Sequence, residues 1–193
     1  MTEQELEKKV GKAILLLGLQ GSSKSLISRY FNEKYGFQVH RTGEKVREYM
    51  QERGMKMNRA SVAETSERLR KSFDSGSICE IYLDNIKKLK EGETIVVDSP
   101  KNNFDVNFYK RYFKTYIVGV FASQNDRFGR VNERRRADCP QDFDDFLKRD
   151  ELEARDIGGL FILSDYLIIT RNHRYQDVYQ QAEKVLRSIR RRK

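Results

Sequence analysis

A short segment rich in glycine and serine carries the clearest chemical signal in this sequence. Residues 18–25 read GLQGSSKS and come directly after the apolar run AILLL. They are close to the pattern GxxxxGK followed by Ser or Thr, a loop that turns its backbone N–H groups toward a phosphate where a helix begins. The segment therefore predicts an ATP site formed by Gly18, Gly21, Ser22, Ser23, Lys24 and Ser25.

Two side chains of this loop have expected roles in phosphate transfer. Lys24 would reach the β- and γ-phosphates, and the Ser25 hydroxyl would bind Mg²⁺. Ser23 departs from the pattern, which has glycine at that position, and its Cβ would strain the loop. Two other interpretations therefore stay open: an ordinary turn between a strand and a helix, and a nucleotide-binding switch that transfers no phosphate.

An aspartate ends another apolar run, TIVVD at residues 94–98. At the end of a neighbouring strand, Asp98 would face the loop and hold Mg²⁺ directly or through water. The alternative is a cap on the turn before Pro100. Lys101 follows into the same cleft, where it is expected to bind the substrate.

Three arginines share one face of a predicted helix. Arg127, Arg130 and Arg134 are spaced three and four residues apart, which places them on one side of the helix. Arginines on a closing lid would stabilise the charge on the transferred phosphoryl group through paired hydrogen bonds. Arg130 and Arg134 are expected to be catalytic, and Arg127 to bind ATP. A solvated basic helix face is the alternative.

An acid and a base open the helix after the second predicted strand. Glu44 would take the proton of an acceptor hydroxyl or orient that hydroxyl. Arg47, one turn later, would hold an acceptor phosphate. The alternative is an acid that matches the helix dipole, next to a surface arginine.

The elements that must position these residues alternate along the chain. Apolar runs predict strands over residues 13–17, 37–40, 94–98, 116–121 and 166–170. Helical spacing predicts helices over residues 25–34, 105–113, 126–136, 142–153 and 175–190, and two or three helical pieces within 44–90, broken near Gly54 and Gly76. Apolar strands alternating with helices indicate an α/β fold, with a parallel sheet covered on both faces. Its ligands bind at the carboxyl ends of the strands.

Composition favours one domain with an anionic ligand. The chain has 193 residues and a formal net charge of +9, with 38 Lys and Arg against 29 Asp and Glu. The basic run RSIRRRK at residues 187–193 is either a solvated helix end or a contact to a nucleic-acid backbone. A nucleic-acid-binding protein that retains the fold is thus another possible class. Without a long apolar stretch or a secretory signal, the expected location is the cytoplasm, and no membrane partner is expected.

From Ala13 to about Ile189 the chain resembles the compact P-loop kinases related to dephospho-CoA kinase and nucleoside monophosphate kinases. The resemblance rests on GLQGSSKS and on five other stretches: TGEKVREYMQERG, VVDSPK, RFGRVNERR, FDDFLKRDELE and SDYLIITRN. Relatives usually have Asp where Glu44 stands and Arg where Lys101 stands. Virus-encoded kinases that phosphorylate 5-hydroxymethyluracil in DNA are an offshoot of the same group.

This resemblance implies a three-layer P-loop NTPase fold whose five parallel strands lie in the order 2-3-1-4-5. It implies one domain, 1–193, with an acceptor-binding helical lobe at 44–90, a lid at 127–141, and Asn172 beside the ATP base. The expected activity is γ-phosphoryl transfer from ATP and Mg²⁺ to a nucleotide-type acceptor. The alternative acceptor is a modified base in DNA, in which case a virus-encoded enzyme would work in the host cytoplasm. The sequence does not specify the oligomeric state.

Overall fold

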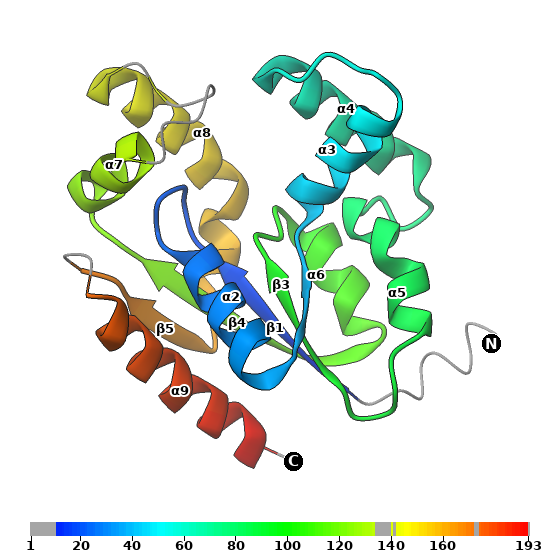
Figure 1. The fold of residues 1–193 in the computed structure, drawn as a ribbon, viewed down its shortest axis with the longest axis vertical. Helices are drawn as coiled ribbons and strands as arrows, with labels where there is room; N and C mark the ends of the chain where they lie inside the picture. The colour runs from blue at the N-terminus through cyan, green and yellow to red at the C-terminus, as the bar shows by residue number, and fades with distance from the viewer. Residues whose placement is uncertain (1–10, 134–139, 141, 172–173, 193) are drawn as a thin grey trace.

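The computed structural model describes residues 11–133, 140, 142–171 and 174–192. They form a parallel sheet of five strands between two layers of helices (Figure 1), in the order β2-β3-β1-β4-β5. The α/β fold class and the predicted strand order 2-3-1-4-5 are therefore confirmed. The strands are β1 Gly11–Leu17, β2 Gln38–His40, β3 Thr94–Asp98, β4 Phe113–Phe121 and β5 Tyr166–Ile169.

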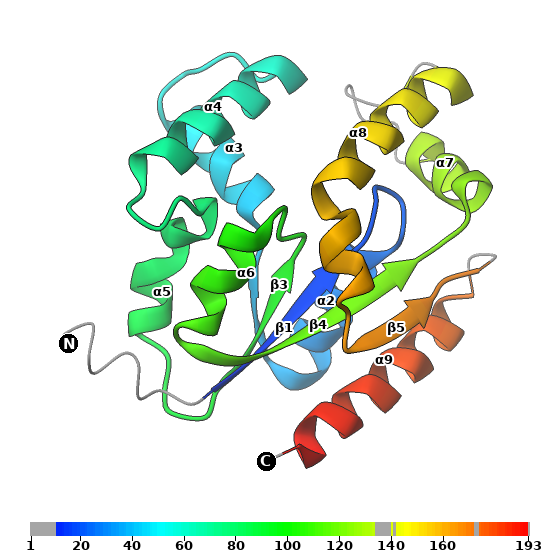
Figure 2. The ribbon, with the colours of Figure 1, turned by 180° about the vertical axis from the view of Figure 1, so that it is seen from behind.

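The helices cover both faces of the sheet. Helices α2 and α9 lie on one face (Figure 1), and α6 and α8 lie on the other (Figure 2). No helix within the described ranges is long and apolar enough to cross a membrane. The helices are α2 Lys24–Tyr35, α3 Thr42–Glu52, α4 Arg59–Ser72, the 3-10 helix η1 Ile78–Tyr82, α5 Leu83–Lys87, α6 Asn103–Lys110, α7 Gln124–Glu133, α8 Phe143–Ile162 and α9 Tyr175–Arg191.

Strand β1 shows why the strands are apolar throughout. Ala13 and Leu15 belong to the apolar cluster under α6 and α8, whereas Ile14 and Leu16 belong to the cluster under α2 and α9. All four side chains are fully buried. Because successive side chains point to opposite faces, a strand covered on both faces has no solvent-facing position.

Several element boundaries differ from the predictions, among them the helix predicted over 105–113, which is α6 Asn103–Lys110. Two others differ for a shared reason. Strand β4 begins at Phe113 rather than Tyr116, because Phe113 and the next residues pair with the start of β1. Helix α8 continues past Glu153 to Ile162, where Ile157 and Leu160 are buried against the sheet. This burial outweighs the two glycines inside the helix, which cost about 1 kcal/mol each. Tertiary contacts therefore extend both elements beyond their local patterns.

The segment predicted as an acceptor lobe contains three α-helices and one 3-10 helix, α3 to α5 with η1. Its breaks fall where predicted, since Gly54 and Gly76 have left-handed φ values of 61° and 64°.

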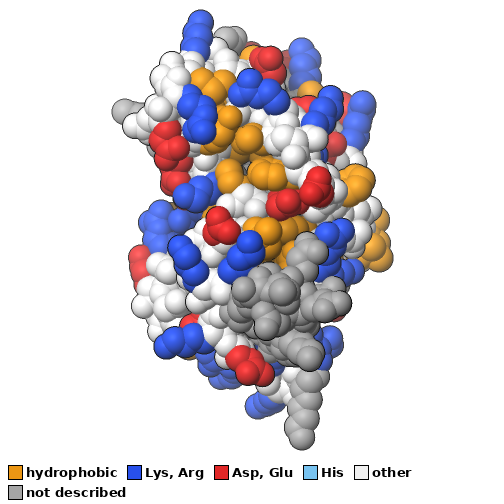
Figure 3. Space-filling model, turned by 90° about the vertical axis from the view of Figure 1, so that its right-hand side faces the viewer, with side chains coloured by type: hydrophobic (Ala, Val, Ile, Leu, Met, Phe, Trp, Pro, Cys, Tyr) orange, Lys and Arg blue, Asp and Glu red, His pale blue; other side chains and the backbone are white. Residues whose placement is uncertain are grey.

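On the face that carries α4, α5 and α6, apolar side chains gather between Lys and Arg side chains (Figure 3). Met57, between α3 and α4, and Phe104, in α6, are 48% and 60% exposed.

Candidate active site

The loop between β1 and α2 needs glycine at two positions. Gly18 has φ 155° and Gly21 has φ 83°. A Cβ on Gly18 would lie 2.3 Å from the Val120 carbonyl oxygen, and one on Gly21 would lie 2.6 Å from the carbonyl oxygen of Arg127. Both approaches are too close for a side chain. The loop is therefore packed against the end of β4 and the start of α7.

Ser23 takes the backbone conformation that the pattern's glycine would take. Its φ and ψ are 73° and 20°, in the left-handed region directly before α2. This conformation costs a residue with a Cβ about 1 kcal/mol. The Ser23 hydroxyl lies 3.3 Å from Nη1 of Arg130. The turn of the loop is thus retained despite the substitution.

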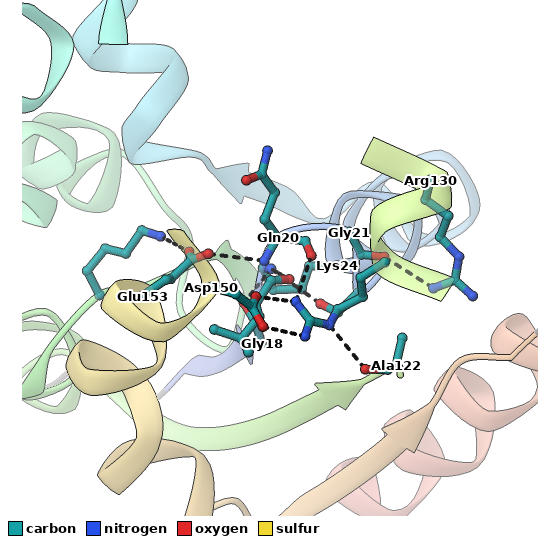
Figure 4. Close-up of polar contacts among 12 residues, drawn as sticks. Gly18, Gln20, Gly21, Lys24, Ala122, Arg130, Asp150 and Glu153 are labelled. Atoms are coloured by element: carbon teal, nitrogen blue, oxygen red, sulfur yellow. Dashed lines mark hydrogen bonds and ion pairs between the residues drawn. The ribbon is translucent and has the colours of Figure 1, made fainter. Parts of the chain in front are cut away.

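Lys24 lies across the loop (Figure 4). Its Nζ donates to the carbonyl oxygens of Gly18 at 2.5 Å and Leu19 at 3.0 Å, and to Oγ of Ser22 at 3.4 Å. The side chain is buried. The ammonium group is therefore held at the loop by the loop's own oxygens, where the phosphates are expected.

Asp98 ends β3 next to the loop, paired in register with Leu16 of β1. Its Oδ2 accepts from Oγ of Ser28 at 3.1 Å, and its Oδ1 accepts from Oγ of Ser99 at 3.0 Å. Asp98 and the exposed Ser25 line the same cavity. A hydroxyl and a carboxylate are the hard oxygen ligands that Mg²⁺ prefers, so these two residues fit the expected metal.

Arg41 lies between the two acids of the site, a role that the sequence analysis did not assign. Its Nε is 3.7 Å from Oδ2 of Asp98, and its Nη1 is 3.5 Å from Oε2 of Glu44. Its Nη2 donates to Oγ of Ser28 at 3.2 Å, and its backbone N–H donates to the Tyr82 hydroxyl at 2.7 Å. The signal available in the sequence was its position directly after β2, at the ligand-binding edge of the sheet.

One cavity of about 610 Å³ brings most of the predicted residues together. Its size is that of a small-molecule site. The predicted residues that line it are Gly21, Ser22, Ser23, Lys24, Ser25, Glu44, Arg47, Asp98 and Lys101. Lining residues without a predicted role include Arg41, Arg70, Arg149, Asp150 and Glu153.

The predicted acceptor residues differ in their surroundings. The Glu44 carboxylate is mostly exposed, with Arg41 as its ion-pair partner. Nη1 of Arg47 donates to the Gly43 carbonyl oxygen at 3.0 Å. Lys101 forms an ion pair with Glu153 of α8. All of these side chains line the cavity, and their roles toward an acceptor stay predictions.

The structure places Arg127 behind the loop rather than in the cavity. Its guanidinium forms a buried ion pair with Asp150, with Nη2 2.6 Å from Oδ2. It also donates to the carbonyl oxygens of Ala122 at 3.1 Å and Gln20 at 3.4 Å. Arg127 and Arg130 thus share one face of α7, and this face packs against the loop. Binding of ATP by Arg127 stays a prediction.

Arg130 supports the loop from the same side. Its Nη1 donates to the Gly21 carbonyl oxygen at 3.1 Å and to the Thr170 hydroxyl at 2.8 Å. Its catalytic role at a closing lid stays a prediction. Arg134, Asn172 and most of the expected lid tip lie outside the described residues.

Glu153 is another residue whose role the sequence analysis missed. Its Oε2 accepts from the backbone N–H of Gln20 at 3.1 Å, and its Oε1 pairs with Nζ of Lys101. Burial by itself raises the pKa of Glu153, but the charges of Lys101 and Lys24 and the hydrogen bonds outweigh it, so the pKa is lowered. The carboxylate is therefore ionised at neutral pH. Its position in the predicted helix 142–153, three residues after Asp150, was the available signal.

A loop that resembles a phosphate-binding loop follows β1, an acid ends β3, and the strands lie in the order 2-3-1-4-5. Together these features define a kinase-like P-loop fold. Solved structures agree on the fold. A shikimate kinase from Bacteroides thetaiotaomicron superposes with a TM-score of 0.61 at 11% identity, over 92% of this chain and 98% of that one. TT1252 from Thermus thermophilus gives a TM-score of 0.67 at 16% identity, over 94% and 98%.

Sequence comparison then shows the family. No family model matches the chain. A UPF0200 protein of Thermococcus kodakarensis is 31% identical over 166 residues, which cover 83% of this chain and 89% of the relative. A UPF0200 protein of Methanococcus maripaludis is 29% identical over 180 residues, 92% of this chain and 97% of the relative. The chain belongs to the UPF0200 family.

Proposed function

We propose that this protein transfers the γ-phosphoryl group of ATP, with Mg²⁺, to a nucleotide-type acceptor, as the resembling dephospho-CoA and nucleoside monophosphate kinases do. The observation that carries the proposal is the cavity of about 610 Å³, in which the loop residues, Asp98, Arg47 and Lys101 meet. Phosphoryl transfer needs this combination, because it is catalysed by positioning and by neutralising charge.

Each group has a role in this reaction. The loop N–H groups and Lys24 bind the phosphates of ATP. Ser25 and Asp98 hold Mg²⁺, which neutralises charge on the phosphate oxygens when bound. Arg47 binds the anionic group of the acceptor.

The transfer itself is one displacement at phosphorus. An acceptor oxygen forms a bond to the γ-phosphorus while the bond between that phosphorus and the β,γ-bridging oxygen breaks, and ADP leaves. Where the acceptor oxygen is a hydroxyl, its proton goes to Glu44. A phosphate acceptor has no proton to lose, so Glu44 then takes no part in the transfer step.

The position of the C-terminal helix favours a free acceptor over DNA. Nζ of Lys12, at the start of β1, donates to the carbonyl oxygens of Ile189 at 2.9 Å and Arg192 at 3.1 Å. The loop follows the other end of β1, and a strand of this length spans about 20 Å. The end of α9 thus lies near the start of β1, at the opposite end of this strand from the loop (Figure 1).

Label transfer from γ-labelled ATP tests the proposal. The acceptors are nucleoside monophosphates, dephospho-CoA and a duplex that contains 5-hydroxymethyluracil. We expect label on a free nucleotide-type acceptor. Label only on the duplex, with an affinity that falls steeply with salt, would assign the acceptor to DNA instead. If the protein binds ATP but labels no acceptor, the result would favour the alternative function, a nucleotide-binding switch that transfers no phosphate.

A further inference from the structure

The backbone of Gln20, in the loop, is bonded from two sides, with its N–H bonded to α8 and its carbonyl oxygen bonded to Arg127 of α7 (Figure 4). Glu153 accepts from the Gln20 N–H at 3.1 Å. Arg127, paired with Asp150 one turn earlier on α8, donates to the Gln20 carbonyl oxygen at 3.4 Å. Gln20 is the third residue of the phosphate-binding pattern. An anionic oxygen of α8 is therefore bonded to a loop N–H of the kind that binds phosphate oxygens.

The same carboxylate determines where a cavity lysine lies. Oε1 of Glu153 pairs with Nζ of Lys101, whose side chain is 43% exposed and lines the cavity with Lys24 and Asp98. A lysine side chain has many rotamers, and holding it in one costs up to about 2 kcal/mol of entropy. The ion pair with Glu153 opposes this cost. It places the ammonium group close to the loop before any substrate arrives.

We propose that Glu153 is a positioning residue that holds the Lys101 ammonium at the mouth of the loop, where Lys101 binds the phosphoryl group during transfer. This inference rests on the proposed function. An ammonium group has three donors, so Lys101 can bind a phosphoryl oxygen and Glu153 together. Glu153 is a poor proton acceptor, since its lowered pKa keeps it ionised. Its part is thus to orient a cation and not to move a proton.

The variant Glu153→Gln separates charge from shape, because glutamine keeps an oxygen for the Gln20 N–H but loses the ion pair. We expect kcat to fall about 30-fold while the KM for ATP changes less than about threefold, as for a contact made mainly in the transition state. Lys101→Ala should lower kcat equally, and the double variant no further, because the two residues act as one unit.

The matched control is Glu151→Gln on the same helix. Glu151 pairs with Arg155, and both side chains are well exposed. This variant should leave kcat unchanged. Equal melting temperatures for the two variants would show that the loss in Glu153→Gln is not a folding defect. A kcat unchanged by Glu153→Gln, or fully additive losses in the double variant, would overturn the proposal.

A second measurement does not require transfer. Reductive ¹³C-methylation keeps the lysine charge, and the Lys101 signal is assigned from its loss in Lys101→Arg. The chemical shift of the Lys101 signal should differ between Glu153→Gln and the wild type, because the ion pair is lost, and should be unchanged in Glu151→Gln. An unchanged signal in Glu153→Gln would overturn the pairing itself. If the Lys101 signal differs as expected but the wild-type protein transfers no label, the ion pair is real and the proposed function is wrong. The positioning role would then be wrong as well, because it rests on that function.

Discussion

Two glutamates of this protein each bind donors from distant parts of the chain, one beside the phosphate loop and one between α2 and α9. Glu153 binds Gln20 and Lys101. Glu183 accepts from the hydroxyl groups of Tyr30 at 2.6 Å and Tyr35 at 2.7 Å, and pairs with Lys34 at 2.8 Å. The pKa of each carboxyl group is lowered.

The two sites differ in what surrounds the donors. The ring of Tyr30 stacks on Tyr179 at 4.3 Å, and the ring of Tyr35 stacks on Phe37 at 5.4 Å, so the two tyrosine partners of Glu183 are packed against other aromatic rings, while Lys34 is exposed. The partners of Glu153 line a cavity instead. The two ion pairs are similarly exposed, and they differ in that the Glu153 pair lines the cavity whereas the Glu183 pair does not.

The largest difference in activity is expected between variants of Lys24, beside Glu153, and Lys34, beside Glu183. Lys24→Ala should lower phosphoryl transfer by about 10³-fold, because it removes a cation from the phosphates. Lys34→Ala, at the seam of α2 and α9, should leave transfer unchanged. Label transfer at saturating ATP measures both. Near wild-type turnover of Lys24→Ala would remove the loop from the chemistry.

Arg127→Ala should be the most destabilising change behind the loop. It leaves the Asp150 carboxylate buried without its partner, which costs about 3 kcal/mol of unfolding free energy. Arg155→Ala, which breaks an exposed pair on the same helix as Asp150, should cost less than about 0.5 kcal/mol. Urea denaturation compares them. Equal unfolding free energies for Arg127→Ala and Arg155→Ala would mean that the buried pair stabilises the fold no more than the exposed pair does.

Glu183→Gln should show the reverse of Glu153→Gln. It keeps an oxygen for the tyrosine hydroxyls but removes the charge that pairs with Lys34, so we expect a small loss of stability. Transfer should not change, since Glu183 lies on the far side of the sheet from α8. Loss of activity at full stability would contradict the division between the two sites.

The smallest effect is the pH dependence of this stabilisation. Burial opposes ionisation of Glu183, but the hydrogen bonds from Lys34, Tyr30 and Tyr35 lower its pKa from 4.5 to about 2. A pKa depressed by folding stabilises the protein fully above the unfolded value, and this contribution is lost as the pH falls from 4.5 toward 2. The stability difference between wild type and Glu183→Gln should therefore be constant above pH 5 and shrink below it. A difference that does not change down to pH 2 would contradict the lowered pKa.

Much of the fold was predictable because it follows local patterns. The buried strands are apolar throughout, and Gly54 and Gly76 mark real breaks between helices. The loop, Asp98 and the acceptor residues follow strands, so they meet at one edge of a parallel sheet. The limits of β4 and α8 were missed, because pairing with β1 and burial against the sheet override weak local signals there.

The sequence by itself determined which residues reach the carboxyl edge of the sheet, since strand ends and loop spacing are local properties. Only the tertiary structure decided which of them meet. Glu153 contacts Gln20 across 133 positions of the chain, and Arg130 contacts Gly21 across 109. Helical spacing placed Arg127 and Arg130 on one face, but it carries no information about the element that this face packs against. Because α7 packs on the loop, both arginines bond to carbonyl oxygens of the loop, and their expected roles toward ATP and the phosphoryl group stay predictions.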